Sequence, residues 1–494
     1  MSAETVAAPA EAEPDPRPDA APPPVRTIAL GTVGSVAMML SSFGAAALPA
    51  HFMGTGPLTW LHYGHGRALA TAAMYLGFVM LVWAWMRLGR YVLDGRVGSR
   101  PVLVATACWT VPMLVVPAVF TRDVYSYLAQ GVVALKGFNP YTVGPDVLGS
   151  GDLLDSVHPF WAGTPAPYGP LFILLAKGIA WVAGGSIFAG VLLTRLVSLL
   201  GLGLLLWALP GLCRHLGGRL PVALWLVVAG PMMVVHLIGG PHNDLLMIGF
   251  LAAGTLLVLD GRHVAGIALV TLGVAVKATA VIALPFLVWV WAGHLTSSRA
   301  RNVVRAIGCA LATFVAVFGA MTLLAGVDLG WIGMLNSSSR IVNWLSLPTA
   351  AGELVHWLVV RFVDVGKDPF TTVTRALGML ALLAVLVRQW WLARDGGPDA
   401  VRRAAIALFA VAILSPTTLP WYLTWGLVLA AGLPWQRRHL AVVVGIAAFL
   451  VVTYTPDGET ALYQWPFMWV AFALSTLAGV SLLRPDPLSV GVRR

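Results

Sequence analysis

Long apolar runs separated by short polar segments dominate the chain. In a lipid bilayer the backbone must satisfy its own hydrogen bonds, so such runs predict transmembrane helices. The pattern predicts an all-α, polytopic membrane protein with about 14 transmembrane helices, several of them shorter than the roughly 20 residues that usually cross the hydrocarbon core. We place these helices near residues 28–50, 68–86, 101–120, 187–209, 221–239, 245–260, 263–276, 279–294, 305–326, 371–391, 403–416, 420–434, 440–455 and 466–483.

One further apolar segment, Tyr168–Gly184, breaks the alternation of the loops. It contains Lys177 and has the sequence YGPLFILLAKGIAWVAG. If it crossed the membrane, Arg214 and Arg219 would lie outside and every later loop would be inverted. Because arginine favours cytoplasmic loops, we expect a re-entrant or interfacial helix on the outer side instead.

Arginines mark every second connection between the apolar runs. These connections hold Arg87, Arg90, Arg96, Arg100, Arg214, Arg219, Arg262, Arg299, Arg301, Arg305, Arg394, Arg402, Arg403, Arg437, Arg438, Arg484, Arg493 and Arg494. By the positive-inside rule these loops and both chain ends are predicted to be cytoplasmic. The opposite loops carry most acidic residues of the membrane domain, and the largest are near 121–167 and 326–369. The extracytoplasmic face is therefore expected to carry the polar chemistry.

The composition supports a membrane protein. Hydrophobic residues make up 58% of the 494 residues and charged residues 11%, whereas soluble domains carry about a quarter charged residues. The net charge of +10 does not indicate nucleic-acid binding, because the arginines lie between apolar runs and form no linear patch interleaved with aromatic residues. The three scattered cysteines have neither a disulfide nor a metal-site spacing.

The chain ends differ from the rest. Residues 1–26 are rich in alanine and proline and carry mostly acidic charges. This predicts a disordered cytoplasmic tail, and not a signal peptide, because a signal peptide begins with a basic region. Residues 27–484 form the predicted membrane domain, and residues 485–494 form a second cytoplasmic tail.

The most informative polar segment is Arg122–Tyr127, which follows the apolar run 101–120. It places a carboxylate, a guanidinium and two phenols at one membrane surface. Asp123 is a candidate general base for a substrate hydroxyl, Arg122 a candidate phosphate ligand, and Tyr125 a candidate sugar or acceptor contact. The alternative is that the first two residues form an ion pair that ends a helix.

A second polar segment, Gly239–Asp244, ends the apolar run 222–238 on the same face. The imidazole, amide and carboxylate of His242, Asn243 and Asp244 could together hold a sugar or a phosphate. The alternative is a helix break at which Asn243 or Asp244 caps the next helix. A lone His and Asp pair is weak evidence for a metal, and no metal site is predicted.

Two cations interrupt apolar runs. A charged group at membrane depth needs a counter-charge or a water-filled vestibule, so it is a functional hypothesis by default. Lys277 and Arg195 could each meet a phosphate in an outer cavity. The alternative is that their long side chains extend to the headgroups.

Aromatic residues of the outer segments are candidate sugar or acceptor contacts. These are Tyr168, Trp344, Trp421 and Tyr422. Any single tryptophan of this kind equally suits the aromatic belt at a membrane interface.

Nucleotide chemistry finds no support in the sequence. There is no P-loop pattern, and Gly201-Leu202-Gly203 lies inside an apolar run instead of at a dinucleotide loop. An enzyme that works on the outer face without nucleotides needs a lipid-linked donor.

Several segments together resemble the membrane-embedded GT-C glycosyltransferases that use polyprenyl-phosphate sugars. Within that class the chain resembles the actinobacterial α-(1→6)-mannosyltransferases of the MptA/MptB type, and more closely the MptA branch. The segments that carry the resemblance are TRDVYSYLAQG, GFNPYTVGP, APYGPLFILLAK, GGPHNDLLMIG, AVKATAVIALPFLVWVW, NWLSLPT, LPWYLTWG and HYGHGRALA.

The resemblance implies transfer of mannose from polyprenyl-phosphate mannose to an α-(1→6)-mannan on a phosphatidylinositol mannoside anchor. The product would be the backbone of lipomannan and lipoarabinomannan, made at the outer face of the plasma membrane. No cofactor is implied, and the partners are the lipid-linked donor, a lipomannan-type glycolipid acceptor and the bilayer. Asp123 matches the acidic residue that acts as base in this class, although two additional apolar segments precede it.

Some alternatives stay open. Asp152 or Asp155 could replace Asp123 as the base, and the donor could carry another hexose. A lipid or sugar transporter is the rival class, and it predicts internal repeats or broken helices near the midplane of the membrane.

Overall fold

The computed structural model describes residues 24–49, 52, 56, 58–335 and 340–483. Within those ranges the chain is helical, and its only β-pairing consists of two isolated bridges, Ala47 to Ala118 and Tyr454 to Thr460. The all-α prediction is therefore confirmed. The predicted tails lie outside the described residues, apart from residues 24–26.

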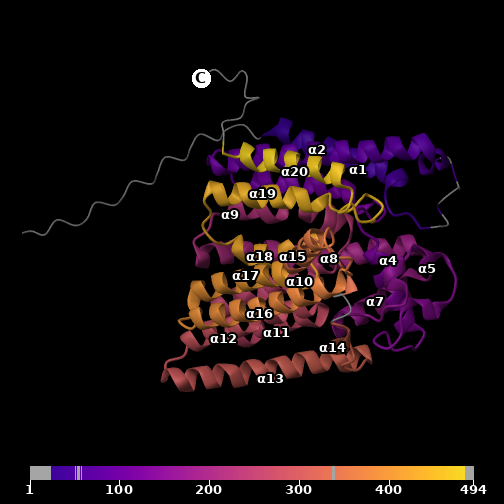
Figure 1. The fold of residues 1–494 in the computed structure, drawn as a ribbon. Coiled ribbons are helices and arrows are strands. Elements are labelled where there is room, and N and C mark those ends of the chain that lie inside the picture. The colour runs from indigo at the N-terminus through magenta and orange to yellow at the C-terminus, as the bar shows by residue number, and fades with distance from the viewer. Residues whose placement is uncertain (1–23, 50–51, 53–55, 57, 336–339, 484–494) are drawn as a thin grey trace, which may run out of the picture.

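The long helices run roughly parallel to one another and stack from α2 to α13 (Figure 1). At one side α1 (Val25–Ala45) packs along α2 (Gly64–Leu93), with α3 (Ser99–Thr110) against α1. A Cβ on Gly34 would lie 2.6 Å from the carbonyl oxygen of Gly77, so the absence of a side chain permits this close approach. The final pair, α19 (Arg437–Val451) and α20 (Trp465–Ser481), lies next to α2.

The centre of the bundle is formed by α8 (Ile187–Leu216), α10 (Asp244–Leu259) and α11 (His263–Val276). Helix α10 contacts both neighbours, and all but one of its residues are buried. A helix that is apolar on every side belongs inside a bundle, as α10 does. Around this centre lie α9 (Leu220–Ala223), α12 (Leu284–Gly293), α13 (Arg299–Ala325), α15 (Leu347–Val359), α16 (Asp368–Leu392), α17 (Gly397–Leu414) and α18 (Leu423–Ala430).

Short helices gather at one end of the bundle, which we call the loop end (Figure 1). They are α4 (Asp123–Leu135), α5 (Asp152–Ser156), α6 (Pro159–Ala162), α7 (Pro170–Ala183) and α14 (Trp331–Met334). Helix α7 has 14 residues, or about 21 Å, which is less than the thickness of a bilayer core. Because α11 has the same number of residues, length does not decide the matter, and the helix that does not cross the membrane stays a prediction.

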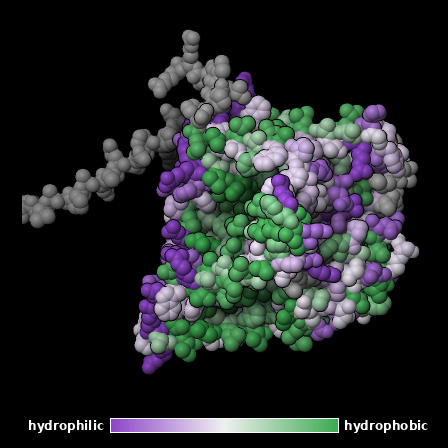
Figure 2. All heavy atoms as spheres, viewed as in Figure 1, coloured by the Kyte–Doolittle hydropathy of each residue, from purple (hydrophilic) through white to green (hydrophobic). Residues whose placement is uncertain are grey.

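Five helices within the described residues are long and apolar enough to cross a membrane, α1, α2, α8, α13 and α16, or six if a bent pair at 220–239 is counted. The protein is thus a membrane protein. The number of about 14 spans, estimated from apolar runs, stays a prediction. Figure 2 shows hydrophobic residues across the middle of the molecule, with hydrophilic residues gathered toward both ends. That distribution is the one expected of a bundle set across a bilayer.

Three of the predicted spans are wrong as continuous helices. In the run 101–120, α3 ends at Thr110, a 3-10 turn covers Val111–Leu114, and the chain then continues in irregular conformation to Asp123. Pro112 and Pro117 lack the backbone N–H that a helix needs. The run stays apolar because Val116–Phe120 is buried inside the protein.

The run 221–239 is bent by 49° between two π-helical segments, Leu224–Val228 and Met232–Gly239, with Pro231 at the break. The run 420–434 contains only the 8 residues of α18 in an α-helix, which is about 12 Å and too short to span a membrane.

Candidate active site

Asp123 is the first residue of α4, at the loop end of the bundle. The hydroxyl oxygen of Thr121 accepts its backbone N–H at 3.1 Å, whereas the N-cap residue, Arg122, makes no side-chain capping bond. A carboxylate in the first turn is also favoured by the helix dipole. The side chain of Asp123 is 17% exposed, and that exposure is toward a pocket.

The carboxylate of Asp123 faces a tyrosine and a histidine. Oδ2 lies 3.5 Å from Nδ1 of His242, and the hydroxyl of Tyr127, one turn along α4, hydrogen-bonds to the carboxylate. Burial raises the pKa of Asp123 to about 6, although the nearby cation of Lys277 opposes the shift. A carboxylate whose pKa lies close to neutral pH is well matched to general base catalysis.

His242 is held neutral. Burial, together with His236 and Lys277, keeps the pKa of its imidazole well below the usual range. The ring stacks on the indole of Trp421 with centroids 3.7 Å apart. Nε2 of His242 and both polar atoms of the Asn243 side chain are buried without a hydrogen-bond partner. Buried polar atoms of this kind need an explanation, and a bound ligand group would provide one.

Asp244 and Lys277 form a buried ion pair. Nζ of Lys277 lies 2.9 and 2.8 Å from the two carboxylate oxygens of Asp244, and the indole N–H of Trp425 donates to Oδ1 at 2.6 Å. Asp244 is fully buried, whereas Lys277 is 15% exposed. The ammonium group also lies 5.2 Å from the ring centre of Tyr422. Because an ammonium has three donors, Lys277 can bind Asp244 and still offer an N–H to the pocket.

Asp123 and Lys277 line one pocket of about 450 Å³, whereas His242, Asn243 and Asp244 are buried and are not among its lining residues. Its polar and aromatic wall includes Asp123, Lys277, Tyr168, Trp421 and Tyr422, so five predicted site residues meet there. The lining also includes apolar side chains, among them Leu335, Met379 and Val411. The pocket thus combines charged, aromatic and apolar lining residues.

Three predicted site residues are bound elsewhere in the protein. Arg122 donates from Nε to the carbonyl of Asp457 at 3.1 Å and pairs with Glu459 at 3.5 Å. Arg195 is buried and donates to four backbone carbonyls, those of Leu114, Pro117, Ile238 and Gly239. The hydroxyl of Tyr125 donates to the carbonyl of Ala47. These contacts are with the protein itself, and the ligand roles of the three residues stay predictions.

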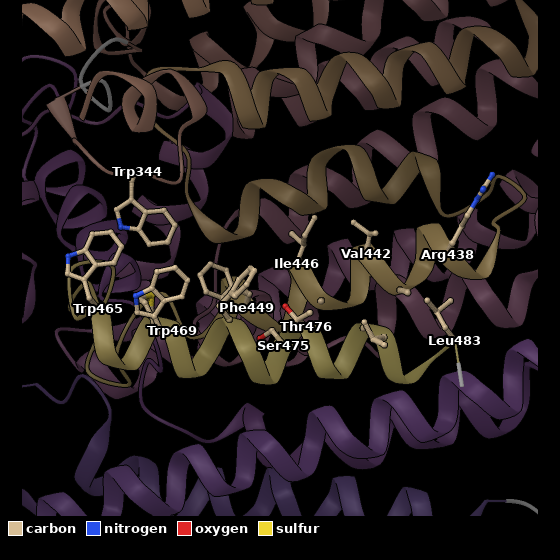
Figure 3. A pocket seen from close by; sticks show the side chains of 16 residues that line it. Trp344, Arg438, Val442, Ile446, Phe449, Trp465, Trp469, Ser475, Thr476 and Leu483 are labelled. Carbon is tan, nitrogen blue, oxygen red and sulfur yellow. The ribbon is translucent and has the colours of Figure 1, made fainter. Parts of the chain in front are cut away.

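Trp344 lies away from this pocket, at a second hollow. Figure 3 shows an apolar groove along α19 and α20, with Trp344 and Trp465 near one end and Arg438 near the other. The groove has a volume of about 810 Å³. Asn343 and Trp344 are fixed by contacts to the carbonyls of Thr418 and Leu462. Trp344 therefore lines the groove and not the Asp123 pocket, and its role as a sugar contact stays a prediction.

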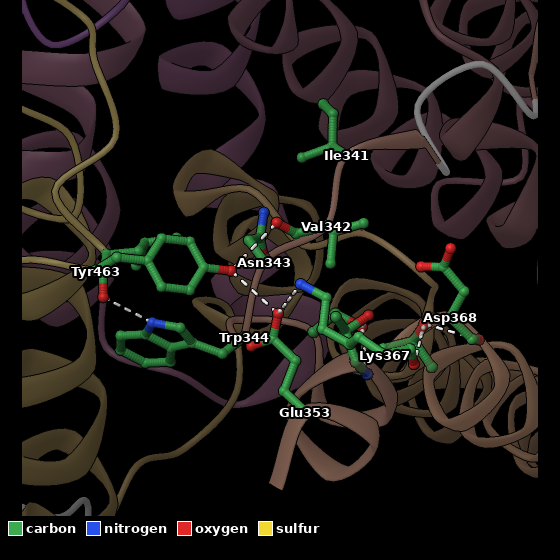
Figure 4. A network of polar contacts seen from close by, with 12 residues as sticks. Ile341, Val342, Asn343, Trp344, Glu353, Lys367, Asp368 and Tyr463 are labelled. Carbon is green, nitrogen blue, oxygen red and sulfur yellow. Dashed lines mark hydrogen bonds and ion pairs between the residues drawn. The ribbon is translucent and has the colours of Figure 1, made fainter. Parts of the chain in front are cut away.

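A polar network lies beside the end of the groove that holds Trp344 (Figure 4). The hydroxyl of Tyr463 donates to the carbonyl of Val342 at 3.3 Å and to Glu353 at 3.2 Å. Lys367 pairs with the same carboxylate at 3.3 Å. The network joins α15, the start of α16 and the segment before α20, and so it anchors the loop that carries Trp344.

Sequence reasoning missed several residues of the site. Tyr127 and Trp425 contact Asp123 and Asp244 directly, and Trp161 lines the pocket. Tyr127 and Trp425 lie inside segments that carried the family resemblance, so their position in those segments was the available signal. Among the described residues no group of three His, Cys, Asp or Glu side chains is arranged to hold a metal ion.

The fold and the pocket define a helical membrane protein in which a carboxylate and a lysine line one pocket together with aromatic and apolar side chains. Comparison with known proteins identifies its family. The model of the α-(1→6)-mannopyranosyltransferase N-terminal domain matches residues 28–293, and that of the MptB C-terminal domain matches residues 348–484. The chain belongs to the α-(1→6)-mannopyranosyltransferase family, and it is a glycosyltransferase. The resemblance to the MptA/MptB type is confirmed, whereas the GT-C fold stays a prediction.

Named relatives cover most of the chain. It is 41% identical to α-(1→6)-mannopyranosyltransferase A of Mycobacterium tuberculosis over 464 residues, which is 92% of this chain and 90% of the relative. It is 32% identical to α-(1→6)-mannopyranosyltransferase A of Corynebacterium glutamicum, over 92% of this chain and 98% of the relative. The chain is 31% identical to α-(1→6)-mannopyranosyltransferase B of Corynebacterium glutamicum, over 85% of this chain and 74% of the relative. No solved structure matches the chain.

Proposed function

We propose that the protein transfers mannose from polyprenyl-phosphate mannose to an α-(1→6)-mannan on a phosphatidylinositol mannoside anchor. The reaction extends the backbone of lipomannan and lipoarabinomannan. The observation that carries the proposal is that the carboxylate of Asp123 and the ammonium of Lys277 line one pocket, in a chain of the mannosyltransferase family.

The chemistry is a single displacement. Asp123 takes the proton of the mannose 6-hydroxyl as that oxygen attacks the anomeric carbon of the donor. The bond between the anomeric carbon and the phosphate oxygen breaks, and its electron pair leaves with polyprenyl phosphate. Attack from the opposite face converts a β-linked donor into an α-linked product. Lys277 is the cation in the pocket that can stabilise the charge developing on the leaving phosphate.

The mixed lining of the pocket suits such a donor. The sugar and phosphate would lie near Asp123 and Trp421. The polyprenyl chain would leave along Leu335 and Met379, two side chains that are exposed on the outside of the bundle. Arginine-rich loops at the opposite end support an extracytoplasmic site in the plasma membrane.

A reconstituted assay tests the proposal. Protein in lipid nanodiscs is given polyprenyl-phosphate mannose and a short α-(1→6)-mannoside, and we expect a new α-(1→6) bond detected by NMR. The matched control is the same lipid carrying glucose. Faster use of that control, or use of a nucleotide sugar without any lipid donor, contradicts the donor assignment. Movement of the lipid across the membrane without bond formation contradicts the enzyme.

The pKa of Asp123 predicts an acid limb in the pH profile. Burial raises that pKa to about 6, and a base works only when it is unprotonated. We expect kcat/KM to rise about tenfold per pH unit below that value and to level off above it. The measurement is the initial rate across pH at low acceptor concentration. A rate that falls as pH increases through this window would instead assign an acid to the site.

A further inference from the structure

We propose that the hairpin formed by residues 453–461 positions Asp123 for catalysis, and that Arg122 serves this contact as a positioning residue. The proposal rests on the role of Asp123 proposed above. The hairpin, called the rim hairpin below, connects α19 to α20 and lies at the same end of the bundle as α4 (Figure 1). It belongs to the C-terminal family region, whereas Asp123 belongs to the N-terminal one.

The rim hairpin is a tightly closed turn. Its backbone is closed by N–H donation from Thr455 to Glu459 at 2.8 Å and from Ala461 to Thr453 at 2.9 Å. Gly458 adopts φ +84°, which is favourable only for glycine. The hydroxyl of Thr455 also donates to the carboxylate of Asp457 at 2.6 Å. These bonds close the turn within its own residues.

The rim hairpin docks on the residues immediately before Asp123. The backbone N–H of Phe120 donates to the carbonyl of Pro456 at 3.0 Å, and Arg122 Nε donates to that of Asp457 at 3.1 Å. A Cβ on Gly458 would lie 2.8 Å from the carbonyl carbon of Thr121. The turn therefore touches each of the three residues that lead into α4.

Phe120 shows that this segment is held in an unusual conformation. Its φ of +58° makes it the one non-glycine residue with positive φ among the described residues. Such a conformation is strained and persists only when the surroundings determine it. Here the surroundings are the bond to Pro456, the burial of the Phe120 ring, and the bridge between Ala118 and Ala47.

Ion pairs also join the rim hairpin to neighbouring segments. Arg67 pairs with Asp457 at 2.7 Å, and Arg122 pairs with Glu459 at 3.5 Å. His158 lies 3.7 Å from the other oxygen of Glu459. The guanidinium of Arg122 is therefore directed to the rim hairpin, which accounts for its absence from the lining of the Asp123 pocket.

The rim hairpin also lies near Trp421, the residue that stacks on the His242 neighbour of Asp123. The ring of Tyr454 lies 6.1 Å from that of Trp421, which stacks on His242. The rim hairpin is thus linked to Asp123 in two ways. It contacts residues 120–122, which precede Asp123, and its Tyr454 lies near Trp421, which stacks on His242. A displacement of about 1 Å at a reacting group can cost on the order of 100-fold in rate, so this support matters to catalysis.

The test compares two glycines with similar positive φ angles. Gly458→Ala adds a methyl group against Thr121, whereas Gly149→Ala is its matched control, because Gly149 has φ +76° with nothing within 4 Å of the added Cβ. We expect Gly458→Ala to lower kcat at least about tenfold, as misplacement of the base requires, with little change in the KM of polyprenyl-phosphate mannose. Gly149→Ala should keep the wild-type rate.

The pH profile separates positioning from loss of folded protein. The groups that face Asp123 are Tyr127, Tyr168, His242, Asp244, Lys277, Tyr422 and Tyr454. If the base moves toward water, its acid limb should shift to lower pH while the plateau falls. A lower plateau with an unchanged limb and equal loss of folded protein would mean that Gly458 only stabilises the fold, and the proposal would be wrong.

Two further variants complete the test. Arg122→Lys keeps a cation but cannot make the same contact with the Asp457 carbonyl, so kcat should fall while the KM of the donor stays constant. A rise in KM alone would instead make Arg122 a phosphate ligand. Asp123→Asn is measured beside them. If it stays active the proposed base is wrong, whereas an inactive Asp123→Asn with a normal Gly458→Ala overturns only the positioning role.

Discussion

Replacing Asp123 by asparagine is expected to lower the rate of mannose transfer by about 10²–10⁴, the usual contribution of a positioned general base. The amide has nearly the same shape but cannot accept the proton of the attacking hydroxyl. The rate is measured with polyprenyl-phosphate mannose and a mannoside acceptor. The KM of the donor should change little, because the pocket keeps its lining and its cation.

Stability provides an independent readout for Asp123→Asn. The pKa of Asp123 is raised mainly because burial disfavours the carboxylate. At pH above that value the charged form therefore weakens the fold, and a neutral amide should leave thermal stability unchanged or higher. Asp152→Asn and Asp155→Asn serve as controls, since both residues are exposed on α5. Full activity in Asp123→Asn, with loss in either control, would transfer the role of base to α5.

The second large effect is expected at the Lys277–Asp244 pair. Lys277→Met leaves the fully buried Asp244 carboxylate without its cation and with the indole N–H of Trp425 still donating to it. Breaking a buried pair by removal of one partner typically destabilises a protein by about 3–5 kcal/mol. We therefore expect both a lower unfolding temperature and a loss of transfer activity. Thermal unfolding in detergent and the rate assay measure the two effects separately.

A double variant separates the two roles of Lys277. Lys277→Met combined with Asp244→Asn removes both charges, so much of the stability should return. The leaving phosphate still lacks its cation, and activity should stay low. Recovery of activity together with stability would show that Lys277 is needed only to neutralise Asp244. It would also remove the support that this residue gives to phosphate binding.

The apolar pattern predicted where most helices lie but not where they end. The run 101–120 shows why, because a residue can be shielded from water by lipid or by protein, and hydropathy is the same in both cases. Phe120 is fully buried in an irregular segment, and its run is as apolar as a span. The same reason explains the bend at Pro231 and the short helix within 420–434.

The site was predictable to the extent that charge stands out against apolar surroundings. Asp123, Asp244 and Lys277 were recognisable because ionisable groups at membrane depth are expensive and usually functional. Their pairing was not predictable, since Lys277 and Asp244 are 33 positions apart and Trp425 lies 181 positions from Asp244. Arg195 had the same sequence signal as Lys277, yet its guanidinium holds four backbone carbonyls.

By itself, the sequence determined an all-helical membrane protein, the family of mannosyltransferases, and the polar residues that its chemistry could use. These follow from local patterns of hydropathy and from short motifs. The tertiary structure decided which of those residues meet in one pocket and which hold the fold together. It also brought the rim hairpin, more than 300 positions away along the chain, against the residues before Asp123. Contacts of that range depend on how helices pack and bend, and neither hydropathy nor motif spacing encodes them.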